Sequence, residues 1–207
     1  MQLSLSNRIR GILLLLLAVV ALRWGYAQSG SQQLRFTPLN IENEGGFSNI
    51  GANDILEDRY GYLWLATWTG LARYDGYDIS LYRQQLDDTI GLKSNKVHTI
   101  YEDSRGNLWV GTRHGGLFKY LRELDQFEQY AADPGNMNSL SNNNVWSIIE
   151  DQDGFLWIGT EKGLNRFDPE TKQFIHYRHD AHDRRSLSHD FVYDVVHAPD
   201  GTIWLGT

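Results

Sequence analysis

Cysteine is absent from the 207 residues, and proline occurs only four times. Without cysteine the chain can form no disulfide and carry no cysteine-linked lipid, so an exported domain would be held together by packing alone. Basic residues are also in deficit, with 19 Lys and Arg against 26 Asp and Glu and a net charge of −7. This acidic balance argues against nucleic acid or an anionic membrane surface as the main partner.

One long apolar run, Ile12–Leu22, lies near the N-terminus. Two arginines precede it and small residues follow it up to Ala27, which predicts a signal peptide over residues 1–27 and export to the periplasm. The run is shorter than the roughly 20 residues that a membrane-spanning helix needs. Arg23 and the lack of an A-x-A cleavage motif leave an uncleaved anchor as the alternative.

Aromatic residues are abundant, at 13% of the chain with seven tryptophans. Four of the tryptophans stand 45, 48 and 47 residues apart and each precedes a short segment ending in threonine: Trp64, Trp109, Trp157 and Trp204. Periods near this length are typical of solenoids and propellers. We expect these four indoles to fill the space between adjacent sheets, with Gly111 and Gly159 allowing close approach of the neighbouring backbone.

One period, residues 145–177, contains four short β-rich runs separated by polar or glycine-containing turns. Four antiparallel strands per period describe one blade of a β-propeller. The sequence therefore predicts an all-β propeller with about three and a half blades and an incomplete ring. The blades are expected at residues 52–82, 97–130, 145–177 and, in part, 192–207.

The connections between these blades repeat as well. Each polar crossing loop carries a leucine five residues before the next inner strand, and we expect it to anchor the loop between sheets: Leu92, Leu140 and Leu187. Residues 28–51 are expected to form a leading outer strand, around 34–39, and a linker. Such a strand would complete the last blade of a closed ring, so the remaining blades of a longer protein are expected partners.

The repeated pattern V-x-x-I-x-E-D-x-x-G-x-L-W-x-G-T-x-x-G-L-x-R-Y/F resembles the two-component regulator propeller repeat. It is best matched at residues 97–130 and 145–177, whereas Ala52 and His197-Ala198 depart from it. The resemblance implies the periplasmic sensor region of a hybrid protein with an inner-membrane helix and a downstream histidine kinase. Many relatives detect glycan fragments, and others end in a diguanylate cyclase.

Ligand contacts are expected where the copies differ from one another. The turn after the Gly-Thr or Ala-Thr pair is such a place, and it holds Trp68, Arg113, His114 and Glu161 in successive copies. An aromatic ring beside cationic and acidic groups could stack on a sugar and bond its hydroxyls, which predicts an oligosaccharide ligand. The alternative is that these residues are solvated hairpin tips, and a homodimer is a further possible partner.

Paired carboxylates recur in three copies and resemble the acids of a glycosidase: Glu57-Asp58, Glu102-Asp103 and Glu150-Asp151. Adjacent strand residues point to opposite faces, and a catalytic pair seldom recurs in every blade, so we predict no catalytic residue. A carbohydrate-active propeller hydrolase or lyase is the alternative. Three histidines at H-x2-H-x2-H spacing fall on a crossing loop, and we expect neither a metal nor a cofactor there: His176, His179 and His182.

Overall fold

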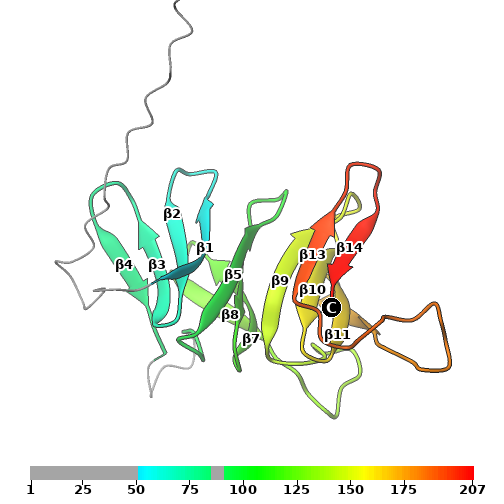
Figure 1. Ribbon diagram of the computed structural model, residues 1–207. Coiled ribbons are helices and arrows are strands. Elements are labelled where there is room, and N and C mark those ends of the chain that lie inside the picture. The colour runs from blue at the N-terminus through cyan, green and yellow to red at the C-terminus, as the bar shows by residue number, and fades with distance from the viewer. Residues whose placement is uncertain (1–50, 85–90) are drawn as a thin grey trace, which may run out of the picture. The chain divides into compact units, whose positions relative to one another are not determined.

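The computed structural model describes residues 51–84 and 91–207 (Figure 1). These residues form three four-stranded antiparallel sheets and one two-stranded sheet, which confirms the predicted all-β propeller of four-stranded blades. The predicted signal peptide and leading outer strand lie outside the described residues. Within the described ranges, no helix is long and apolar enough to span a bilayer.

Each sheet follows the chain order, so every strand pairs with its sequence neighbours through a short turn (Figure 1). The first sheet contains β1 (Ala52–Glu57), β2 (Leu63–Thr67), β3 (Gly70–Tyr74) and β4 (Ile79–Tyr82). The second contains β5 (Val97–Glu102), β6 (Leu108–Thr112), β7 (Gly116–Leu121) and β8 (Gln126–Tyr130). The third contains β9 (Val145–Glu150), β10 (Leu156–Thr160), β11 (Gly163–Asp168) and β12 (Gln173–Tyr177), and the fourth β13 (Asp194–His197) and β14 (Ile203–Gly206).

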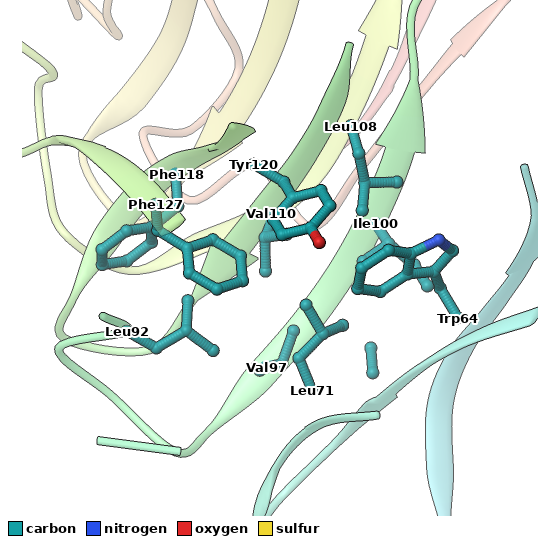
Figure 2. Close-up of a cluster of buried hydrophobic side chains, with 11 residues drawn as sticks. Trp64, Leu71, Leu92, Val97, Ile100, Leu108, Val110, Phe118, Tyr120 and Phe127 are labelled. Atoms are coloured by element: carbon teal, nitrogen blue, oxygen red, sulfur yellow. The ribbon is translucent and has the colours of Figure 1, made fainter. Parts of the chain in front are cut away.

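The hydrophobic core lies between blades rather than within one. Trp64 and Leu71 of the first sheet pack in one cluster with Phe118 and Phe127 of the second (Figure 2). Leu92 from the crossing loop joins this cluster and is 1% exposed, which is the anchoring role expected of it. Burial of these large apolar groups is what holds successive blades together.

The inner strands β1, β5, β9 and β13 lie next to one another in chain order. A Cβ added at Gly111 would come within 2.6 Å of Val145 Cγ1, and one at Gly159 within 2.8 Å of the Val192 carbonyl oxygen. Both distances are shorter than a carbon atom allows. Glycine at these positions therefore permits the next inner strand to approach, and Ala66 occupies the same position in the first blade.

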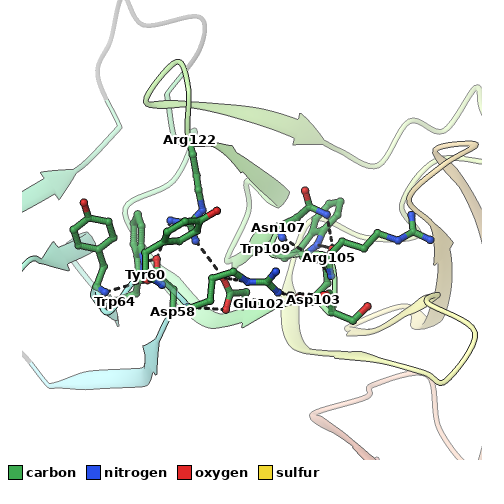
Figure 3. Close-up of polar contacts among 12 residues, drawn as sticks. Asp58, Tyr60, Trp64, Glu102, Asp103, Arg105, Asn107, Trp109 and Arg122 are labelled. Atoms are coloured by element: carbon green, nitrogen blue, oxygen red, sulfur yellow. Dashed lines mark hydrogen bonds and ion pairs between the residues drawn. The ribbon is translucent and has the colours of Figure 1, made fainter.

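Each complete blade contains one bond between an indole and a carboxylate, which is buried in the first two blades and partly buried in the third. Nε1 of the tryptophan donates to Oδ2 of the aspartate that begins the preceding turn, as in Trp64 to Asp58 at 2.8 Å and Trp109 to Asp103 at 2.8 Å (Figure 3). Trp157 donates to Asp151 at 2.7 Å in the same way. The other carboxylate oxygen accepts two backbone N–H groups of the turn, so one side chain closes the hairpin and fixes the indole.

The glutamate beside each aspartate has a different task. Glu102 accepts the backbone N–H of Arg59 in the preceding blade at 3.0 Å, and Glu150 accepts that of Ser104 at 2.7 Å. The repeated carboxylate pair is thus divided between the hairpin of its own blade and the turn of the blade before. In the fourth copy His197-Ala198 replaces the pair.

The third blade provides a matched test of the aspartate's role, because its turn holds two aspartates. Asp151→Ala removes the acceptor of Trp157 Nε1 and of two turn N–H groups, so we expect the free energy of unfolding to fall by about 2–3 kcal/mol. Asp153 is exposed, and Asp153→Ala should change it by less than about 0.5 kcal/mol. Urea unfolding followed by tryptophan fluorescence measures both, and equal effects would contradict the assignment.

Candidate functional site

A β-bulge occurs at the second residue of the inner strand in each of the first three blades. In β5, Val97 pairs with Thr112 and Thr99 with Gly111, so His98 is the extra residue. The registers of β1 and β9 skip Asn53 and Trp146 in the same way. A bulge residue leaves the ladder and its side chain is redirected, a device that often borders functional sites.

The bulges bring side chains from successive blades into a row. Trp68 of the first blade meets the His98 ring edge-on with centroids 5.2 Å apart, and His98 lies 4.2 Å from Trp146. Trp146 in turn contacts Phe191 at 5.5 Å and Tyr193 at 5.4 Å. We call these five residues the aromatic row. They come from four successive repeats, because the start of an inner strand and the turn after its neighbour lie at the same end of a blade.

The electrostatic environment keeps His98 neutral. Burial lowers the pKa of His98 below its ordinary value of 6.5, and the positive charges of Arg113 and His114 lower it further. The Val145 carbonyl and the Glu161 carboxylate raise the pKa, but by less. The Nδ1 atom lies 3.2 Å from the Val145 carbonyl oxygen, which can only accept, so Nδ1 carries the proton and Nε2 has a free lone pair.

Three buried nitrogen atoms around this histidine have no hydrogen-bond partner among the described residues. They are His98 Nε2, Trp146 Nε1 and Arg113 Nε. Buried polar groups are nearly always paired with protein, water or ligand, so such a group in a native structure requires an explanation. Together they offer one acceptor and two donors beside aromatic surfaces, which is the chemistry that recognises a hydroxylated ring.

The four ligand-contact residues predicted from the sequence lie around this row. Trp68 is 45% exposed and belongs to the row, and the charges of Arg113, His114 and Glu161 act on His98. Asn144 joins two of them, since its Oδ1 accepts the His114 N–H at 2.7 Å and its Nδ2 donates to Glu161 at 2.6 Å. The structure therefore places these turn residues in one region, and their role as ligand contacts stays a prediction.

His98 and Trp146 were missed by the sequence analysis. Both occupy the second position of an inner strand, which holds Asn53, His98 and Trp146 in the first three copies, and Tyr193 directly precedes β13 in the fourth. That position differs between the copies, so the rule applied to the turns would have found it.

The other predicted constellations are engaged elsewhere. His176 Nε2 lies 2.7 Å from the Ser139 carbonyl oxygen and His179 Nδ1 lies 2.7 Å from that of Leu187, so these rings do not converge with His182. Among the described residues, no group of three or more potential ligands is placed to hold a metal ion. The paired carboxylates serve the turns and seams described above.

The fold and its repeated indole–carboxylate bond define a β-propeller built from four-stranded blades. The sequence matches the two-component regulator propeller family four times, at residues 46–69, 91–114, 139–162 and 186–207. The chain belongs to this family, and the predicted resemblance is confirmed. A comparison with curated proteins gave no match.

Solved structures agree with this assignment. The chain is similar to the extracellular domain of BT3049 from B. thetaiotaomicron, described as a hybrid two-component system, with 28% identity and a TM-score of 0.73 over 82% of this chain. It is also similar to that of BT4673 from the same organism, with 25% identity and a TM-score of 0.68 over 85%. The chain spans 23% of each of these two solved domains. A virginiamycin B lyase from Staphylococcus aureus shares the fold at 14% identity, covering 82% of this chain and 52% of its own, with a TM-score of 0.59.

The charges around His98 can be tested by titration. We expect NMR to place the pKa of His98 below 6.5, with a further decrease in Glu161→Gln and an increase in Arg113→Gln, because the carboxylate raises the value and the guanidinium lowers it. At pH values between the lowered pKa of His98 in the folded protein and its ordinary pKa in the unfolded chain, the unfolded chain binds more protons than the folded one. The free energy of unfolding should therefore rise with pH in that range. A higher pKa in Glu161→Gln would contradict the arrangement.

Proposed function

We propose that this chain is part of the periplasmic sensor region of a hybrid two-component protein and that its ligand is an oligosaccharide. The family and the similar extracellular domains support a sensory role. The observation that carries the ligand assignment is the set of three unpartnered nitrogens beside an exposed indole. Sugars present hydroxyls at their edges and C–H groups on their faces. The nitrogens can bond the hydroxyls, and the aromatic rings can stack on the C–H faces.

Each member of the row has a defined part in this proposal. The exposed Trp68 stacks on the flat face of a sugar ring, as aromatic side chains do with ligands of this shape. These three nitrogens are buried in the unliganded arrangement, so in this proposal their side chains turn outward on binding. His98 Nε2 then accepts from a hydroxyl, while Trp146 Nε1 and Arg113 Nε donate to hydroxyl or ring oxygens. An oligosaccharide is favoured over a monosaccharide because the row extends across four repeats.

Signalling in the proposed protein follows from where the row lies. Its residues come from different blades, so a ligand bound across it interacts with the relative positions of those blades. A ligand shifts a conformational equilibrium only by its differential affinity for the two states, and contacts to several blades provide such a difference. We propose that the change passes to an inner-membrane helix and a cytoplasmic histidine kinase, with a homodimer as the signalling unit.

The ligand assignment predicts a loss of affinity when the exposed indole is removed. Trp68→Ala should weaken binding of the complete exported region to oligosaccharide pools by about three- to tenfold, measured by isothermal titration, because a stacking contact of this kind is worth about 0.5–1.5 kcal/mol. Tyr77→Ala is the matched control, since Tyr77 is 92% exposed on the β3–β4 turn, away from the row.

Unchanged affinity in Trp68→Ala would remove the row from the proposed site. The sensor assignment has its own test, because the coding sequence downstream should encode a membrane helix and histidine kinase motifs. A stop codon directly after one closed propeller would contradict it and would leave the fold without the proposed output.

A further inference from the structure

A groove of about 580 Å³ with a mixed polar and apolar lining lies beside the aromatic row. It is bounded by the crossing loop that leads from β8 to β9 and by the turn between β10 and β11. Its lining includes two cations, two histidines and a run of asparagines: Lys162, Arg178, His114, His176, Asn143 and Asn144. His176 Nε2 and the Asn144 amide already bond to other protein groups, so Lys162 and Arg178 are the cationic donors that the groove offers a ligand.

The groove and the row are parts of one surface region. His114 lines the groove, and it lies close enough to His98 of the row to influence the pKa of that residue. Asn144 also lines the groove and directly precedes the inner strand that carries Trp146. Asn144 is held on both sides, by the His114 N–H and by Glu161, so the junction is fixed in place. A ligand longer than one sugar on the row would extend into the groove.

The two cations of the groove have no counterion in the described part of the chain. Lys162 and Arg178 appear in none of the ion pairs there, whereas six other arginines of the described ranges do. The one acid in the lining, Asp133, accepts the Gly135 N–H within its own turn. In a chain of net charge −7, a groove with two unpaired cations and one acid is a local excess of positive charge.

The polar neighbours of these cations favour an anion over a neutral group. Lysine, arginine and amide N–H groups donate to carboxylate and sulfate oxygens, and charge-assisted bonds of this type are about twice as strong as neutral ones. The stem of Arg178 lies over Gly163, which has a positive φ of 108° and no side chain to displace it. Gly163 directly follows Lys162, so the Arg178 side chain passes next to the turn that carries Lys162. Both cations line the groove.

We propose that the groove binds the anionic substituent of an acidic oligosaccharide, a carboxylate or a sulfate ester, whose adjacent ring stacks on the aromatic row. This inference rests on the proposed carbohydrate-sensing function and specifies its ligand class. Neutral oligosaccharides would occupy the row alone. The sensor would then distinguish acidic from neutral polysaccharide fragments by charge rather than by ring shape.

The test compares acidic probes with neutralised forms of the same backbone. Isothermal titration of the complete exported region would use oligogalacturonate and its methyl ester for the carboxylate, and chondroitin sulfate oligosaccharides before and after desulfation for the sulfate ester. We expect at least one acidic probe to bind about tenfold or more tightly than its neutralised partner, a difference of about 1.4 kcal/mol. The affinity should also fall with added salt.

Variants assign the charge effect to the groove. Lys162→Gln with Arg178→Gln should remove the preference for the acidic probe and leave binding of the neutralised probe unchanged. Arg184→Gln with Arg185→Gln removes two charges from the exposed crossing loop after β12 and should leave the preference intact. Lys162 and Arg178 are both exposed, so we expect the double variant to fold normally, and circular dichroism of each variant checks this.

The outcomes separate this inference from the function on which it rests. Equal binding of acidic and neutralised probes, with both weakened by Trp68→Ala, would overturn the anionic groove and support the carbohydrate site on the row. A charge preference that survives in the Lys162→Gln, Arg178→Gln variant would also overturn the groove. If no probe of either kind binds, both proposals fail.

Discussion

The bond between a buried indole N–H and an aspartate carboxylate is the interaction on which each blade depends. An indole that fills the space between two sheets leaves its only polar atom away from water, and leaving it unpaired would cost a large part of the gain from burial. The aspartate meets this need from the turn of the same hairpin, and with its second oxygen it closes that turn. The bulk of the core and the path of the chain are therefore fixed by one side chain.

The bond also explains why the following features repeat. The bond from Trp109 to Asp103 fixes the position of β6. Gly111 lies two residues after Trp109, at the point where the next inner strand passes close to β6. The neighbouring Glu102 faces the blade before and accepts a backbone N–H there. Hairpin closure, core filling and blade-to-blade spacing thus share one short segment.

The sequence was sufficient for the blades because strand, turn and period each leave a local signal. The inner strand Val145–Glu150 and its three partners could be placed to within a residue or two. The roles of the two acids could not be predicted, since the partner of Glu150 lies 46 residues away and depends on how two sheets meet. The bulges were hidden for a related reason. One inserted residue reverses which face a side chain takes, and no residue type at that position signals it.

The bonds that stabilise each blade and the residues of the aromatic row are different sets, which bears on how the proposed ligand could change the propeller. Within a blade, the indole bond and the two bonds that close the turn all come from one aspartate. Between blades, the exposed glutamate bonds act together with the buried hydrophobic clusters and, between the first two blades, with the ion pair from Arg122 to Asp58 at 2.8 Å. The ligand proposed for the row would contact side chains from several blades. Its binding would therefore depend on the relative positions of those blades, which the core between them sets.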